Sequence, residues 1–501
     1  MTVIGYAYVQ DRLKLPLPPV AIPALIRSVT RVERLAGELA VPAKRAPDED
    51  VIEHLLFALK HEGTDLQVLA AACAHLAPAA LLAQLRAAPA GQYIRKLCAI
   101  WEAITGQLLE GLPAGISGSV ALLFDPTLYV TVEGANRDKR WGVAFNGLGD
   151  WDFCPSVRRT PQLEALLKAD PLAQVREFLD TVPPEQLERA LAWAYLDETR
   201  STFEIEGERP AGNKQEAFAA LLRQAHARQT LDEERWVELQ NATVTSKLAQ
   251  EASFRTFQNH LSSGVPGPRG VSYLPPPPAL VHSLLASISR LANVETAPGI
   301  APLVRAALAS FGFVFAHPFG DGNGRLSRYL AHYALCQSGA LPSGSILPLS
   351  AAMRRNELKY LQALKSFSVP ARELWKVTWL DGEKFDFEFL GSPSMYRYFD
   401  ATPCVSFLYE MALEVLRKDL KEEVAYLSCY DEVVRRVNDR YDIQGSTLAN
   451  LIRMAYQNGG VFSKNRREQF ADQVETAALE FIEAQVRELN PHLTQGRLES
   501  T

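Results

Sequence analysis

The chain contains 501 residues, 47% of them hydrophobic and 22% charged, so its composition is that of a globular protein and its length predicts about three domains. The formal net charge of −6 leaves no basic excess, which argues against general nucleic-acid binding. The six cysteines are scattered without a Cys-x-x-Cys pair, so we expect a cytoplasmic protein without a disulfide framework or a structural zinc site. No run of about 18 apolar residues and no secretory signal pattern occurs, so neither a membrane span nor export is expected.

The N-terminal part of the sequence combines helical and strand patterns. Residues 1 to about 115 are predicted to be mostly helical, because apolar residues recur there at helical spacing, as over 51–59. The pattern then changes to short runs of β-branched and aromatic residues separated by turn residues. These runs predict strands at 120–124, 129–132 and 141–145, after which helices resume near Pro161.

The central part predicts helices interrupted by one hairpin. A long helix is expected at 185–206, and helices at 303–316 and 324–337 are expected to pack against each other through an apolar stripe. Glycines and prolines at 264–270 separate two β-compatible runs, which predicts a β-hairpin with a mobile tip over 257–274.

The fold class that follows is mainly α. Another helix is expected at 352–365, mixed aromatic sequence at 370–400 is interpreted as a connection, and residues from 403 to 489 are predicted to be helical. We therefore predict a mostly helical N-terminal domain with a small β element, a central domain and a helical C-terminal domain. Their predicted limits are 1–184, 185–385 and 386–501.

Residues 317–328 read His-Pro-Phe-Gly-Asp-Gly-Asn-Gly-Arg-Leu-Ser-Arg and concentrate the residue types that a metal-bound polyphosphate requires. Gly320, Gly322 and Gly324 allow backbone N–H groups to approach an anion without interference from a Cβ atom. Asn323 is a favourable N-cap, so a helix is expected to begin there with its positive end facing the loop.

Charged side chains complete this motif. Arg325 and Arg328 lie on one helix face, and each guanidinium can fork onto phosphate oxygens. Asp321 is a candidate ligand for a metal ion. An unperturbed histidine titrates near about pH 6.5, so His317 can accept a proton at physiological pH.

Other phosphate and metal motifs fit this segment poorly. A Walker loop needs Gly-Lys-Ser/Thr after its glycines, which is absent here, and a dinucleotide fingerprint needs a preceding strand where this sequence predicts a helix. A calcium loop starting at Asp321 would need glycine and glutamate where Leu326 and His332 stand.

The motif at 317–328 resembles the signature of the Fic family, His-Pro-Phe-x-Asp/Glu-Gly-Asn-Gly-Arg-x-x-Arg, at every defined position. The resemblance implies a helical Fic core with a β-hairpin flap, and transfer of AMP from Mg-ATP to a Ser, Thr or Tyr hydroxyl of a target protein. It assigns His317 as the general base, Phe319 as the anchor of the loop and Asp321 as the Mg²⁺ ligand. The residues that it assigns to the phosphates are Gly320, Gly322, Asn323, Gly324, Arg325 and Arg328.

A second motif, Thr-Phe-Glu-Ile-Glu-Gly at 202–207, resembles the inhibitory motif that precedes the catalytic loop in this family. The resemblance implies that Glu206 pairs with Arg328 and excludes the terminal phosphate of ATP, with Thr202 and Gly207 completing the motif. Without the resemblance, Gly207 is the expected end of a helix. A carboxylate at that end opposes the helix dipole, at a cost of about 0.3–1 kcal/mol that a cationic partner would offset.

The resemblance also assigns binding surfaces. The hairpin at 257–274 corresponds to the flap on which a target segment docks by β-strand addition. Asn356 and Tyr360, four residues apart on an expected helix, resemble positions that line the nucleotide pocket.

Three hypotheses about function follow. The first is an autoinhibited adenylyltransferase that modifies a target protein or itself. The second keeps the site but transfers another phosphate-containing group, or removes AMP with Glu206 activating water. The third is a nucleotide-binding regulator without catalysis.

Overall fold

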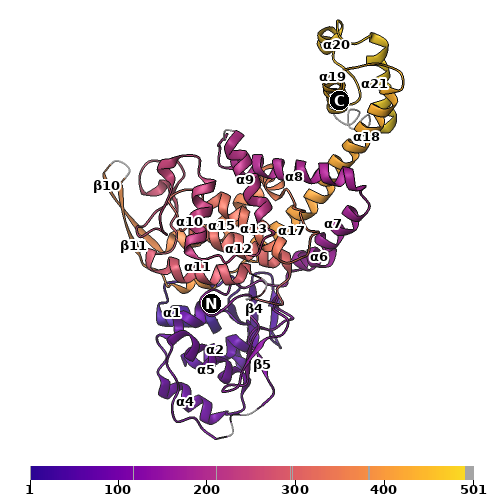
Figure 1. The fold of residues 1–501 in the computed structure, drawn as a ribbon. Helices are drawn as coiled ribbons and strands as arrows, with labels where there is room; N and C mark the ends of the chain where they lie inside the picture. The colour runs from indigo at the N-terminus through magenta and orange to yellow at the C-terminus, as the bar shows by residue number, and fades with distance from the viewer. Residues whose placement is uncertain are drawn as a thin grey trace.

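The computed structural model describes residues 2–114, 116, 118–209, 212–293, 295, 297–381 and 384–490. The chain folds mainly into helices with small two- to four-stranded sheets, which confirms the predicted fold class. Figure 1 shows the N-terminal module below a central helical body, and a small helical bundle at the end of the long helix α18.

The N-terminal module contains a sheet that the sequence analysis missed. Its four strands have the order β1-β2-β4-β3, and β2 pairs with β4 in parallel. The prediction of a mostly helical segment up to residue 115 did not include this sheet, because such short strands depend on distant pairing and carry little periodicity of their own. The sheet consists of β1 (Val3–Ile4), β2 (Ala24–Arg27), β3 (Glu33–Leu35) and β4 (Glu38–Pro42).

Helices pack against this sheet and form the rest of the module. They are α1 (Gly5–Leu13), the 3₁₀ turn η1 (Ala43–Arg45), α2 (Val51–His61), α3 (Leu66–Cys73), α4 (Pro78–Ala87) and α5 (Gln92–Thr105). Among the described residues no single helix is long and apolar enough to cross a membrane, although the bent pair α3–α4 has the length and composition.

A three-stranded sheet follows in the order β5-β7-β6. Its strands are β5 (Ala121–Leu122), β6 (Asn136–Asp138) and β7 (Val143–Phe145). The strands predicted at 120–124 and 141–145 are present in shorter form as β5 and β7. The third, at 129–132, is wrong, since Tyr129 forms only an isolated bridge with Arg158.

The central body is built around the buried helical hairpin of α12 (Pro302–Ala316) and α13 (Asn323–Gln337). All residues of α12 except Pro302 and Val314 are buried, because nearly all of its residues are apolar or small, on every side of the helix. The surrounding helices are α6 (Pro161–Ala169), α7 (Pro171–Asp180), α8 (Pro184–Ile205), α9 (Gly212–Gln224), α10 (Glu233–Thr243), η2 (Lys247–Ala249), α11 (Pro278–Ala292), α14 (Leu349–Arg355), α15 (Glu357–Glu373), α16 (Ser394–Arg397) and α17 (Thr402–Glu414).

Two β-hairpins lie on one side of this body. The hairpin expected over 257–274 is present as β8 (Leu261–Ser262) and β9 (Val271–Tyr273), with the turn η3 (Pro268–Gly270) between them. A second hairpin, β10 (Trp375–Asp381) with β11 (Lys384–Phe389), replaces the predicted connection at 370–400. Three of its cross-strand pairs are aromatic or β-branched with aromatic, such as Trp375 with Phe389, and these pairs stabilise the hairpin.

The C-terminal part is helical, as predicted. Helix α17 continues through a π-helical segment, η4 (Val415–Leu420), into α18 (Lys421–Asn438). The helices α19 (Gly445–Gln457), α20 (Lys464–Phe470) and α21 (Thr476–Leu489) then pack with α18 around a core of their own. The largest core instead draws residues from Leu148 to Leu420, beyond both ends of the central domain predicted at 185–385, so those domain limits remain a prediction.

A buried acid fixes α8 against the central hairpin. Glu198 of α8 is fully buried, and its carboxylate accepts the backbone N–H of Ser350 at 2.7 Å as well as the Ser350 hydroxyl. The Nε2 atom of His332 on α13 lies 2.8 Å from Glu198 Oε1. Burial alone would raise the pKa of Glu198, but His332 and the Ser350 hydrogen bonds outweigh it, and the pKa is lowered. The carboxylate is therefore ionised and joins three helices.

We expect Glu198→Ala to lower the free energy of unfolding by about 3 kcal/mol, because the substitution leaves His332 and Ser350 without their buried partner. Urea unfolding followed by tryptophan fluorescence measures the change. Glu198→Gln should lose less, and Glu188→Ala, on the exposed face of the same helix, should be neutral. Equal stability of all four proteins would contradict the assigned role.

Candidate active site

His317 ends α12 in an unusual backbone conformation. Its φ of 47° lies in the left-handed region, and its N–H still donates to Phe313 O at 3.0 Å. The ring atom Nδ1 lies 3.1 Å from Val314 O in the last turn of the helix. Because a carbonyl oxygen can only accept, the proton is assigned to Nδ1, which leaves Nε2 as a free acceptor.

Burial changes the titration of His317 from the value expected for an exposed histidine. The side chain is 8% exposed, and burial lowers its pKa to about 4, although the Val314 hydrogen bond opposes the shift. The cation Arg255, whose Nε donates to the carbonyl of His317 at 2.8 Å, lowers the pKa further. The imidazole is therefore neutral at pH 7.

The loop after His317 is closed by Asn323, but not in the predicted way. Gly322 is the N-cap of α13, with φ of 86°, and Asn323 is the first helical residue. The Asn323 side chain instead accepts the Phe319 N–H at 3.1 Å and donates to Phe319 O at 2.8 Å. The Asn323 side chain therefore forms hydrogen bonds with both the N–H and the C=O of Phe319. The sequence alone cannot distinguish this role of an asparagine from helix capping. Phe319 is fully buried against Phe254, so it anchors the loop as expected.

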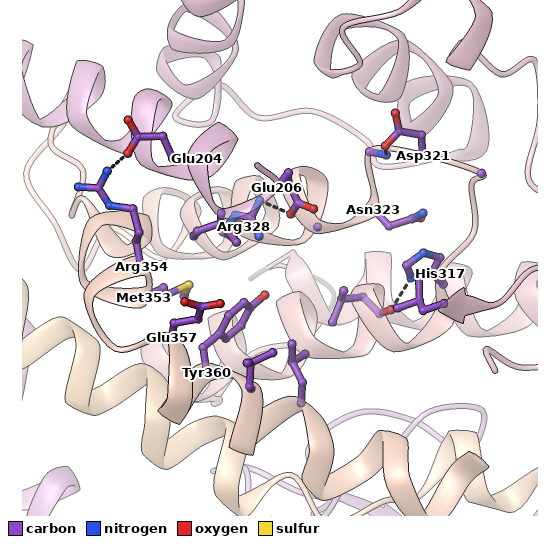
Figure 2. Close-up of a pocket in the computed structure, with 18 residues that line it drawn as sticks. Glu204, Glu206, His317, Asp321, Asn323, Arg328, Met353, Arg354, Glu357 and Tyr360 are labelled. Atoms are coloured by element: carbon purple, nitrogen blue, oxygen red, sulfur yellow. Dashed lines mark hydrogen bonds and ion pairs between the residues drawn. The ribbon is translucent and has the colours of Figure 1, made fainter. Parts of the chain in front are cut away.

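A cavity of about 410 Å³ opens at the N-terminus of α13 (Figure 2). The loop and α13 supply one wall, the end of α8 faces them, and α14 and α15 supply the floor. Leu261 of the β8–β9 hairpin reaches the mouth. Of the predicted residues, those that line the cavity are His317, Gly320, Asp321, Gly322, Asn323, Gly324, Arg328, Tyr360 and Glu206. Those outside its lining are Thr202, Gly207, Arg325 and Asn356.

Glu206 and Arg328 form the expected ion pair inside the cavity. Arg328 Nη2 lies 2.7 Å from Glu206 Oε1 and 2.9 Å from Thr202 O, and its Nε donates to Thr202 Oγ1 at 2.6 Å. Burial would raise the pKa of Glu206, but the charge and hydrogen bond of Arg328 dominate and lower it. The Glu206 carboxylate is thus ionised and is paired with the Arg328 guanidinium, which is only 2% exposed.

The turn that carries Glu206 has a defined geometry. Gly207, with φ of 72°, follows the end of α8; its N–H donates to Glu204 O, and the N–H of Glu208 donates to Phe203 O. This pair of hydrogen bonds is a Schellman motif, which accounts for glycine at 207. Opposite it, a Cβ atom at Gly324 would lie 2.2 Å from Glu206 Oε1, so glycine permits the close approach of the carboxylate to α13.

Two further carboxylates of this turn, which the sequence analysis did not assign, also pair with arginines. Glu208 lies 2.8 Å from Arg325, a side chain that is 1% exposed. Glu204 forms an ion pair with Arg354 of α14 at the rim of the cavity (Figure 2). The alternating glutamates at 204, 206 and 208 are visible in the sequence, but their partners come from distant segments.

The remaining predicted residues have distinct surroundings. Asp321 is 46% exposed and accepts the Gly322 N–H at 2.5 Å and Arg325 at 2.9 Å. Asn356 donates to Glu414 Oε2 at 2.8 Å, which directs its amide away from the cavity. Tyr360 is buried and stacks on Phe407 with ring centroids 5.5 Å apart.

Comparison with known proteins finds similarity to one family over part of the chain. Residues 220–335 match the model of the Fic/DOC family. A stretch of 93 residues, 19% of this chain, is 36% identical to Protein adenylyltransferase Fic of Drosophila melanogaster and covers 18% of that protein. A stretch of 77 residues, 15% of this chain, is 39% identical to Protein adenylyltransferase fic-1 of Caenorhabditis elegans and covers 15% of it. The chain thus spans less than a fifth of the length of these curated relatives.

Solved structures of Fic proteins align with larger parts of the chain. A Fic domain containing signaling protein from Bacteroides thetaiotaomicron aligns with a TM-score of 0.37 at 19% identity, over 52% of this chain and 96% of its own. Fic-1 from C. elegans aligns with a TM-score of 0.34 at 16% identity, over 76% of this chain and 96% of its own.

We expect the imidazole of His317 to titrate well below the range of an exposed histidine, at about pH 4. The unfolded chain binds this proton near about pH 6.5, so the folded state loses stability as the pH falls from there toward 4. NMR titration of histidine ring protons measures the pKa, with the exposed His75 as the internal control and His317→Asn for assignment. A pKa of His317 above 6 would contradict the buried, neutral state.

Proposed function

We propose that this chain, which contains a Fic/DOC family domain at residues 220–335, is an autoinhibited protein adenylyltransferase. It transfers AMP from ATP to a hydroxyl group of a target protein. The observation that carries this proposal is one cavity that combines a neutral histidine, the N-terminus of a buried helix and a buried arginine held by a glutamate.

His317 has the properties of the general base. Its Nε2 atom is the free acceptor of a neutral imidazole that lines the cavity. An attacking hydroxyl gives up its proton as its oxygen bonds to the α-phosphorus, while the bond from phosphorus to the pyrophosphate oxygen breaks. The fixed ring orientation places this acceptor before substrate arrives, which reduces the entropic part of the barrier.

The wall formed by the loop and α13 suits an anionic leaving group. The first backbone N–H groups of α13 and the helix dipole favour negative charge at the loop Gly320–Gly324. Arg328 can fork onto phosphate oxygens once Glu206 leaves it. These groups are held in place before the reaction, so they stabilise developing charge without reorganising.

Asp321 fits the role of the Mg²⁺ ligand. Its carboxylate is half-exposed at the cavity, and among the described residues no cluster of three or more metal-binding side chains occurs. Mg²⁺ characteristically binds through one or two carboxylates together with substrate phosphates, which is consistent with a single acid here. When bound, the ion would neutralise phosphate charge; Asp321 would have to exchange its contact with Arg325 for it.

The β8–β9 hairpin is the proposed dock for the target. Leu261 on β8 is 41% exposed and also lines the cavity, so this strand runs past the mouth of the site. A two-stranded sheet leaves edge N–H and C=O groups unpaired, and an extended target segment can add to them. The hydroxyl of that segment, from another protein or from this chain, would then approach His317.

Glu206 is the proposed inhibitor. Its carboxylate forms an ion pair with Arg328. A nucleotide must therefore displace this carboxylate before the terminal phosphate of the nucleotide can bind Arg328. The same ionised carboxylate lies in the cavity and can alternatively activate water for removal of AMP, which we keep as the second candidate.

We expect Glu206→Gly to increase AMP labelling by roughly 10-fold or more, because it frees a buried guanidinium for the nucleotide. Intact-mass analysis of the protein incubated with ATP and Mg²⁺, alone and with a cell extract, measures the added group. Glu188→Gly, exposed on the same helix, is the matched control. Labelling that does not rise above wild type would contradict inhibition, and an added mass other than AMP would contradict the transferred group.

We expect His317→Ala in the Glu206→Gly protein to reduce labelling by about 100-fold or more, the typical contribution of a general base. ATP binding, measured by calorimetry, should persist, because the phosphate-binding groups remain. His75→Ala provides the control. Labelling that survives the loss of His317 would exclude it as the base.

A further inference from the structure

The cavity carries an excess of negative charge in the resting protein. Among the described residues, its charged lining consists of the carboxylates Glu204, Glu206, Asp321 and Glu357 and the guanidiniums Arg328 and Arg354, with His317 neutral. Both guanidiniums are paired with carboxylates of the same turn at the end of α8. A polyphosphate that enters this cavity meets repulsion unless those carboxylates leave.

Arg325, the other arginine of the sequence motif, does not relieve this repulsion directly. Its side chain is 1% exposed, contacts Glu208 at 2.8 Å and Asp321 at 2.9 Å, and lies outside the cavity lining. Among the residues that the structure describes, Arg354 is therefore the one cation besides Arg328 that lines the cavity.

Arg354 differs from Arg328 in its freedom to move. Arg328 is 2% exposed and held by Thr202, whereas Arg354 is 39% exposed and forms an ion pair with Glu204, itself 34% exposed. An exposed pair of this kind contributes little stability, so Arg354 can exchange its partner at low cost. Figure 2 shows the pair Glu204–Arg354 beside the pair Glu206–Arg328 along one side of the cavity.

We infer that Arg354 is a second phosphate-binding arginine, and that Glu204 competes with the nucleotide for it as Glu206 competes for Arg328. This inference rests on the proposed function. The two carboxylates leave the arginines together, because both belong to the Schellman turn around Gly207 and one displacement of that turn moves both. Arg354 then turns toward the cavity and binds the oxygens of the phosphate tail beyond the α-phosphate.

The test compares ATP with AMP, because only ATP carries that tail. In the Glu206→Gly protein, Arg354→Ala should weaken ATP binding about 10-fold, the usual effect of one charge-assisted contact, and leave AMP binding unchanged. Arg354→Lys should keep most of the ATP affinity. Arg200→Ala, which removes an exposed, paired arginine of α8 outside the cavity, should change neither. Isothermal titration calorimetry with each nucleotide and Mg²⁺ gives the dissociation constants.

A substitution of Glu204, the acid proposed to compete for Arg354, provides an independent test. Glu204→Gln, in a protein with Glu206 intact, should tighten ATP binding several-fold without changing AMP binding, because it frees Arg354 while Arg328 stays paired. A loss of affinity that is equal for ATP and AMP in Arg354→Ala would indicate a structural role and overturn the inference. Unchanged ATP affinity on adding Arg354→Ala to a Glu206→Gly protein that binds ATP would also overturn the inference. If Glu206→Gly binds no ATP at all, the proposed function fails and this inference with it.

Discussion

The site depends on one electrostatic constraint: a guanidinium buried as deeply as Arg328 needs hydrogen-bond acceptors or an anion in place of water, and at Arg328 one of these partners is an anion. Removing a charge from water costs several kcal/mol, and an unpaired buried charge is strongly destabilising. In the resting chain the partner is Glu206, and in the proposed reaction it is a phosphate. In the proposed mechanism these two anions are alternatives for one position, so binding of the nucleotide and release of inhibition would be the same event. Gly324 makes this possible, because a side chain there would collide with the carboxylate.

The packing of the central body keeps the opposing groups in place. The buried helix α12 holds His317 at one end, and the short loop to α13 leaves little freedom for the groups between them. Glu198 ties α8 to α13 and α14 at the other side of the cavity. Helix α8 is thus held by the buried contacts of Glu198, while the turn at its end around Gly207 rests on ion pairs whose carboxylates are partly exposed. This difference allows the turn to move without unfolding the core.

The flanking regions also contact the walls of the site. Asn356 and Arg355, next to the cavity residues of α14 and α15, bind Glu414 and Asp419 at the π-helical segment before α18. The C-terminal bundle is therefore attached to the floor of the cavity through one continuous helix, as Figure 1 shows. The β10–β11 hairpin packs on the flap through His260 and its aromatic side chains. Neither connection is evident from the local motifs.

The sequence alone determined the site where chemistry requires adjacent residues. The loop 317–328, the helices on both sides of it, the hairpin at 257–274 and the pair Glu206–Arg328 were all predicted from local spacing and family resemblance. Tertiary structure decided what depends on burial and distant contacts. It lowered the pKa of His317, moved the N-cap from Asn323 to Gly322, left Arg325 outside the cavity lining and placed Arg354 at the cavity rim. It also formed the sheet β1–β4 and the hairpin β10–β11, since short strands are stabilised by partners that a linear pattern does not contain.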